Sequence, residues 1–272
     1  MGRGIATHCA QKGMRLVLAD IQLHSLARTE ADLQALGAEV LTAQTDVSRL
    51  EEVENLANKS YETFGAVDLL VNNAGVASAT STVLESSLDD WHWVMGVNFY
   101  GMLHGIRTFV PRMIEQNTAG HIVNVASLGG VVEAVDLYHV SKHAAVALTE
   151  TLYHELADSA PQLKVSAFMP GLINTGLYLA EESRPSRFSN SVTPSGSNSA
   201  EMREFFNTYG FPVDAAVQVL FEGLAQEKLY IGPKAFQRQS PRILDVIQNR
   251  AENIVKELNP KHPRDIGPVN PV

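Results

Sequence analysis

Apolar residues follow two patterns along this chain, and the two patterns alternate. Unbroken runs such as residues 121–126 predict buried strands, whereas apolar residues spaced three or four apart, as in residues 22–36, predict helices with one buried face. This alternation favours a parallel sheet covered by helices on both faces. The predicted strands are residues 15–19, 39–43, 67–72, 121–126, 163–169 and 228–231. The predicted helices are residues 3–12, 22–36, 49–64 (capped by Ser48), 88–115, 212–226 and 240–258, with one more carrying residues 138–142.

The pattern breaks down between residues 174 and 210. Within this stretch, residues 189–199 are mostly Ser and Asn with Thr, Pro and Gly, so they have little apolar surface to offset the cost of ordering. We expect their amide hydrogens to exchange rapidly in the free protein. The chain ends in a final helix and a Pro-rich tail over residues 240–272.

The composition is that of one globular α/β domain spanning residues 1–272. Hydrophobic residues make up 45% of the chain and charged residues 19%. The net charge of −9 argues against nucleic acid as a partner, because binding to phosphates needs a basic surface. Cys9 is the only cysteine, which excludes an internal disulfide and fits the cytoplasm. No apolar run approaches the ~18 residues that would suggest a membrane span.

Tyr138 and Lys142 form the most informative pair in the sequence. Residues four apart share one helix face, and an ammonium beside a phenol favours the phenolate. We expect Lys142 to lower the pKa of Tyr138 from ~10 by roughly 1–3 units, which allows proton exchange with an alcohol or ketone. The same spacing is common on solvated helix faces, so the pair alone does not decide the function.

Several small and polar residues follow the predicted strands in a fixed order. Asn73-Ala74-Gly75 is a small-residue turn after the strand at 67–72, Ser127 closes the strand at 121–126, and Pro170-Gly171 breaks the strand at 163–169. Together with Asn98, Tyr138, Lys142 and Thr175, this ordered set resembles the short-chain dehydrogenase/reductase family over about residues 2–235. The resemblance implies a Rossmann-like, doubly wound parallel sheet. It also implies an NAD(P)-dependent oxidoreductase acting on a secondary alcohol or ketone.

The resemblance also implies a role for each residue at the reaction centre. Tyr138 would donate or accept the proton, and Lys142 would hold the nicotinamide ribose as well as tune the phenol. Ser127 would hydrogen-bond the substrate oxygen, and Asn98 would support a water that links Lys142 to solvent. The alternative for Ser127 and Asn98 is a buried polar residue with satisfied hydrogen bonds. The segment from Ser127 to Tyr138 is shorter than is usual in the family by roughly two residues, which predicts a displaced Ser127.

Asp20 indicates the choice of cofactor. A carboxylate at the end of the strand at 15–19 accepts hydrogen bonds from ribose hydroxyls and repels a 2′-phosphate, which favours NAD over NADP. Arg3 is a nearby base that would instead favour NADP. Asp46 and Val47 would hold the adenine edge, although Asp46 is equally suited to capping the next helix. The other residues expected to contact the cofactor are Gly2, Asn73, Ala74, Gly75, Tyr138, Lys142, Pro170, Gly171 and Thr175.

The start of the chain departs from the family pattern. Gly2 matches the last glycine of the phosphate-binding turn, and the strand and glycines expected before it are not among the 272 residues. Either Met1 is an internal methionine of a longer protein, which we favour, or the chain is a truncated product. In both cases the strand at 15–19 should lack its inner neighbour, and this form should bind NAD poorly and aggregate.

Two further functions are open to this fold. Dehalogenation by related enzymes uses Ser, Tyr and Arg, and Lys142 argues against it. A cofactor-impaired pseudoenzyme would serve as a binding or oligomerisation partner, and we expect a homo-oligomer in either case. No metal is expected, because His139, His143 and His154 lack partners at a metal-binding spacing. The candidates for an apolar substrate pocket are Val131, Val132, Val135, Leu137, Phe188, Phe205, Phe206 and Phe211, some of which core packing explains equally well.

Overall fold

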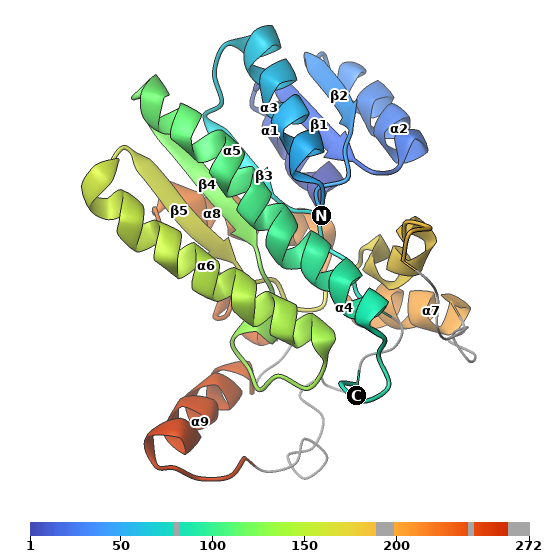
Figure 1. Ribbon diagram of the computed structural model, residues 1–272, viewed down its shortest axis with the longest axis vertical. Coiled ribbons are helices and arrows are strands. Elements are labelled where there is room, and N and C mark those ends of the chain that lie inside the picture. The colour runs from blue at the N-terminus through green and yellow to red at the C-terminus, as the bar shows by residue number, and fades with distance from the viewer. Residues whose placement is uncertain (79–81, 189–198, 239–241, 261–272) are drawn as a thin grey trace.

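The computed structural model describes residues 1–78, 82–188, 199–238 and 242–260 (Figure 1). Its strands are β1 (Leu16–Asp20), β2 (Val40–Gln44), β3 (Leu69–Asn72), β4 (Gly120–Val125), β5 (Leu163–Phe168) and β6 (Tyr230–Ile231). Its α-helices are α1 (Gly2–Gln11), α2 (Leu23–Gln34), α3 (Leu50–Phe64), α4 (Leu88–Met95), α5 (Gly101–Gln116), α6 (Leu137–Ser159), α7 (Ser199–Tyr209), α8 (Val213–Ala225) and α9 (Ile243–Val255).

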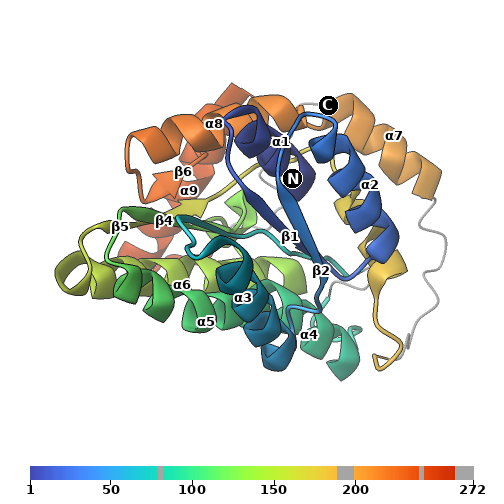
Figure 2. The same cartoon turned by 90° about the horizontal axis from the view of Figure 1, so that it is seen from above.

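All strand pairs are parallel, as the alternating pattern predicted. Strand β1 pairs with β2, and a second sheet has the order β3-β4-β5-β6. Figure 2 shows α3, α5 and α6 on one side of the strands and α1 and α8 on the other. This is the Rossmann-like α/β arrangement with helices on both faces. Within the described residues, none of the helices is both long and apolar enough to cross a lipid bilayer.

The two sheets do not join. In the described part of the chain, β1 pairs only with β2 and β3 pairs only with β4, so the facing edges of β1 and β3 have no strand between them. A cavity of about 1640 Å³ reaches into this gap and is lined there by Leu16–Asp20 and Leu69–Asn72. The missing inner neighbour of β1 agrees with expectation, although this arrangement does not establish a truncation.

The structure adds detail to two local predictions and corrects a third. The predicted helical region at 88–115 contains two helices, α4 and α5, joined by a π-helical turn, η1 (Gly96–Tyr100). Ser48 does not cap α3, because the N-cap is Arg49 and the Ser48 hydroxyl donates to Asp46 at 2.6 Å. The stretch at 174–210 includes the 3-10 turns of η3 (Gly176–Ser183) and helix α7. The Ser/Asn-rich residues 189–198 lie outside the described residues.

A buried polar network fixes the register of the central elements. The amide of Asn72 at the end of β3 donates to Asn124 of β4 at 2.8 Å, and Asn124 donates to Thr149 of α6 at 3.1 Å. Gly105 of α5 passes so close that an added Cβ would overlap the Asn72 side chain. Paired buried polar groups of this kind favour one arrangement over others, because any shift leaves them unsatisfied. The network therefore holds α6, which carries Tyr138 and Lys142, against the ends of β3 and β4.

Candidate active site

The predicted site residues meet at the carboxyl ends of the parallel strands. This edge is where ligands bind in open α/β sheets. One cavity is lined by all but one of them: Gly2, Asp20, Asp46, Val47, Asn73, Ala74, Gly75, Ser127, Tyr138, Lys142, Pro170, Gly171 and Thr175. Asn98 is the exception and lies directly behind the wall, since an added Cβ at Gly75 would sit 3.5 Å from its Oδ1 and 3.4 Å from the Lys142 Nζ.

Tyr138 and Ser127 lie within hydrogen-bonding reach of each other. Burial raises the pKa of Tyr138, and the hydrogen bond with the Ser127 hydroxyl opposes that rise. The backbone N–H of Leu128, the next residue, donates to the Pro170 carbonyl at 3.0 Å, which ties this turn to the end of β5. The shortened segment leaves Ser127 beside Tyr138, and its displacement relative to the family stays a prediction.

Lys142 does not act on Tyr138 as the sequence predicted. Its side chain is only 3% exposed, and burial lowers its pKa to about 8. The ammonium donates to the Val125 carbonyl at 3.0 Å and lies 5.6 Å from the centre of the Tyr138 ring. The expected lowering of the Tyr138 pKa was wrong, because burial dominates the phenol and the lysine is directed toward a backbone oxygen.

Asn98 lies in the π-helical turn η1, a type of segment often found at functional sites. Its Oδ1 accepts from the Val76 N–H at 2.8 Å, and its Nδ2 donates to the Val76 carbonyl and the Ser141 hydroxyl, each at 2.9 Å. Ser141, to which the sequence analysis gave no role, donates in turn to the Tyr138 carbonyl at 2.7 Å. Asn98 thus braces the loop after β3 against α6. Its predicted link to a water stays a prediction.

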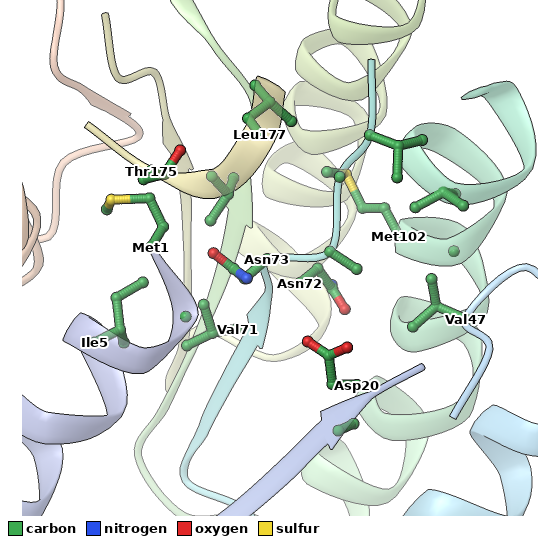
Figure 3. A pocket seen from close by; sticks show the side chains of 18 of the residues that line it. Met1, Ile5, Asp20, Val47, Val71, Asn72, Asn73, Met102, Thr175 and Leu177 are labelled. Atoms are coloured by element: carbon green, nitrogen blue, oxygen red, sulfur yellow. The ribbon is translucent and has the colours of Figure 1, made fainter. Parts of the chain in front are cut away.

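At the adenosine end, Asp20 is exposed at the tip of β1 and points into the pocket (Figure 3). One carboxylate oxygen accepts from the Gln22 N–H at 2.9 Å, an interaction within the turn that does not use the other oxygen. Arg3 pairs with Asp32 of α2 at 2.6 Å, with both side chains about half exposed. The positive charge that would favour NADP is therefore already matched by a carboxylate.

Asp46 is bound to other side chains rather than free for adenine. Its carboxylate accepts from the Ser48 N–H and hydroxyl at 3.0 and 2.6 Å, and from Arg187 at 2.6 Å. Although burial alone would raise the pKa of Asp46, these hydrogen bonds hold it below the ordinary value. Val47 packs against Gly101 of α5, and its carbonyl is 2.9 Å from His104 Nδ1. Asp46 and Val47 both line the cavity, and the Asp46 carboxylate fixes the loop itself.

The residues between these ends fit a dinucleotide. The first turn of α1 has no acidic residue, and its leading N–H groups lack partners within the helix, which suits a pyrophosphate. Gly2 abuts Asn73, since a Cβ there would lie 2.9 Å from Asn73 Nδ2. Asn73 Oδ1 is buried without a hydrogen-bond partner in the described residues. This acceptor needs a donor, such as a ribose hydroxyl of a dinucleotide or a water, whereas the N–H groups at the start of α1 suit the pyrophosphate.

The substrate end is only partly apolar. Thr175 points into the pocket beside Leu177 (Figure 3). Of the predicted apolar candidates, Val132, Val135, Leu137 and Phe206 line the cavity. Phe211 instead packs edge-on against Phe236 in the core. Within the described residues, no three His, Cys, Asp or Glu side chains are placed to hold a metal ion.

Sequence reasoning missed the arginines that follow η3. Arg184 is 4% exposed and pairs with Asp90 of α4 at 2.6 Å, over the ring of Trp93. Arg187, three residues after Arg184, donates a hydrogen bond to the Asp46 carboxylate. Both lie in the stretch where the periodic pattern fails, and nothing in the sequence marks their partners. Buried Asn72 and Asn124, by contrast, are visible as polar residues inside apolar strand patterns.

The chain matches the family model for short chain dehydrogenases over residues 1–185. It is 31% identical over 266 residues to a CLA biosynthesis dehydrogenase/reductase of Lactiplantibacillus plantarum, covering 95% of this chain and 91% of that one. It is 33% identical over 180 residues to an (S)-acetoin-forming diacetyl reductase of Staphylococcus epidermidis, covering 65% and 69%. The chain therefore belongs to the short-chain dehydrogenase/reductase family. The family match begins at residue 1 and gives the expected truncation no support.

Solved structures agree with this assignment. A short chain dehydrogenase/reductase of Burkholderia phymatum in complex with NAD superposes with a TM-score of 0.88 at 40% identity, covering 96% of this chain and 92% of that one. An NAD+-bound xylitol dehydrogenase gives a TM-score of 0.66 at 27% identity, covering 80% and 85%. The protein is an NAD(P)-dependent oxidoreductase of this family.

Proposed function

We propose that the protein transfers a hydride between NAD and the carbon of a secondary alcohol or ketone. The observation that carries the proposal is the meeting of Ser127, Tyr138 and Lys142 at the cavity that also contains the exposed Asp20 carboxylate. Bound nicotinamide would supply or accept the hydride. The protein residues then have to orient the reacting oxygen and move one proton.

The geometry of the side chains supports a division of roles. The Ser127 hydroxyl, beside the phenol, would hold the substrate oxygen, and the phenol would exchange its proton with that oxygen. Lys142, whose pKa burial lowers to about 8, can be neutral or charged near physiological pH and would contact the nicotinamide ribose. Asn98 would act through position, because it braces Val76 and Ser141 on either side of the site.

Asp20 leads us to propose NAD rather than NADP. We expect nicotinamide fluorescence titrations to show tighter binding of NADH than of NADPH, because the carboxylate repels a 2′-phosphate. Asp20→Ala should lower the ratio of the NADPH and NADH dissociation constants at least fivefold. Asp158→Ala, which removes an exposed carboxylate outside the cavity, should leave this ratio unchanged. A preference for NADPH in the unmodified chain contradicts this assignment.

We also propose that residues 174–210 form a lid over the substrate end of a single domain spanning residues 1–272, followed by a C-terminal helix and tail over 240–272. Leu177, Leu179 and Ala180 of η3 line the cavity. Arg184 attaches the next turn to Asp90 of α4, and Arg187 attaches it to Asp46 at the cavity. We place the protein in the cytoplasm as a homo-oligomer with a small-molecule substrate. Amide exchange that slows over residues 176–188 when cofactor and substrate bind together would support the lid.

A cofactor-impaired pseudoenzyme, acting as a binding or oligomerisation partner, is the second candidate. The gap between β1 and β3 favours it, because the pyrophosphate would lie over an incomplete sheet. The complete Ser127, Tyr138 and Lys142 set opposes it. Measured NAD affinity separates the two functions, because a pseudoenzyme of this kind binds the cofactor poorly.

A further inference from the structure

Asp136 and His139 form a dyad at the start of α6 that the mechanism above does not use. Asp136 is the N-cap, and its Oδ1 accepts from the His139 N–H at 2.8 Å and lies 2.6 Å from the imidazole Nδ1. Their side chains are 24% and 22% exposed, and both residues line the cavity. Capping the helix requires only the contact with the His139 N–H. The contact with Nδ1 in addition fixes the orientation of the imidazole ring.

The dyad determines what the imidazole presents to the cavity. Although burial alone would raise the pKa of Asp136, hydrogen bonds from His139 hold it below the ordinary value, so the carboxylate is ionised and accepts. Nδ1 therefore carries the hydrogen, and in the neutral form of the ring Nε2 has a lone pair. Within the described residues, no side chain or backbone group hydrogen-bonds Nε2.

The ring edge lies close to the Ser127 hydroxyl. A Cβ built on Gly129 would be 3.3 Å from His139 Nε2 and 3.5 Å from Ser127 Oγ, so both polar atoms flank the same point of the turn η2 (Leu128–Gly130). The Gly129 N–H donates to Ser127 Oγ at 3.1 Å, which fixes the hydroxyl on that side. Because Gly129 has no side chain, His139 Nε2 and Ser127 Oγ lie on either side of an open point, and a substrate held by Ser127 could place a neighbouring group near Nε2.

We propose that His139, oriented by Asp136, binds a hydroxyl on the carbon next to the reacting carbon, so that the substrates are α-hydroxy ketones and the corresponding vicinal diols. The inference rests on the proposed hydride transfer, in which Ser127 holds the reacting oxygen. A lone pair on Nε2 accepts from a hydroxyl but has nothing to accept from a carbonyl or a methylene. His139 is a specificity-determining residue in this account and takes no part in the proton transfer.

The test compares two ketones that differ by one hydroxyl. The unmodified chain with saturating NADH should have a higher kcat/KM for 3-hydroxy-2-butanone than for 2-butanone, and His139→Phe should lower the ratio of the two roughly tenfold, mainly through KM. Asp136→Asn keeps a capping side chain and should lower the ratio by a smaller factor. His154→Phe, an exposed histidine on the same helix, should leave the ratio unchanged.

Other outcomes separate this inference from the proposed function. If the ratio is unchanged in His139→Phe, the inference is overturned and the proposed hydride transfer stands. An equal loss of kcat/KM with both ketones also overturns the inference, because it indicates that the dyad only caps the helix. If neither ketone is reduced, saturation-transfer NMR with NAD present decides. The subsite is supported if the protein binds 2,3-butanediol but not 2-butanol and if His139→Phe abolishes that binding. Equal binding of the two alcohols overturns it.

Discussion

Replacing Tyr138 with phenylalanine is expected to lower kcat by roughly 10²–10⁴-fold, the range that a positioned general acid or base contributes. The substitution removes the phenolic hydroxyl that lies against Ser127 and leaves the aromatic ring in place. NAD affinity should change little, because the cofactor residues at Asp20, Gly2 and Asn73 are untouched. NADH absorbance measured with saturating cofactor gives kcat, and nicotinamide fluorescence gives the affinity.

Tyr153→Phe is the matched control for this result. Tyr153 is on the same helix and is 40% exposed, away from the cavity. It should retain full activity. A Tyr138→Phe protein that turns over at a near-wild-type kcat would remove Tyr138 from the mechanism.

A strand placed in the gap between β1 and β3 is expected to strengthen NAD binding at least tenfold and to suppress aggregation. Both facing edges present unpaired backbone groups, and their side chains line an open cavity. A strand that ends in a glycine-rich turn would pair both edges and add N–H groups for the pyrophosphate.

The experiment fuses six β-branched residues and a glycine-rich turn ahead of Met1 and compares this form with the 272-residue chain. The control fusion has two prolines within the strand, which remove ladder hydrogen bonds at similar length. Calorimetric titration measures NAD affinity, and light scattering measures aggregation. Equal, tight NAD binding by the unfused chain would show that the gap does not impair the cofactor site and would remove the case for a pseudoenzyme.

The predictable part of the fold follows from residues whose role is set by the local sequence. The strand-ending positions of Asp20, Asn73, Ser127 and Pro170 indicated one edge of a parallel sheet, because apolar runs mark strands and parallel strands share their carboxyl ends. The cavity contains all four. Tyr138 and Lys142 share their helix face for the same local reason.

What could not be predicted depends on contacts between distant segments. The pKa of Tyr138 depends on burial and on the direction of Lys142, and that direction is set by the Val125 carbonyl 17 residues earlier. Asp46 pairs with Arg187, 141 positions away, so its carboxylate fixes a loop where the sequence indicated adenine. His139 resembled a bystander in the sequence, and only the turn at Gly129 brings it near Ser127.

Transfer of deuterium from cofactor to substrate tests the central claim most directly. The protein is incubated with NADH in which both C4 hydrogens of the nicotinamide are replaced by deuterium, and with a panel of aliphatic, cyclic and aromatic ketones that includes 3-hydroxy-2-butanone. Mass spectrometry should find one deuterium on the new carbinol carbon of at least one product, and Tyr138→Phe should lower the rate at which this product forms by roughly 10²–10⁴-fold. Tight NADH binding by the unmodified chain without deuterium in any product would contradict the claim that this site transfers hydride.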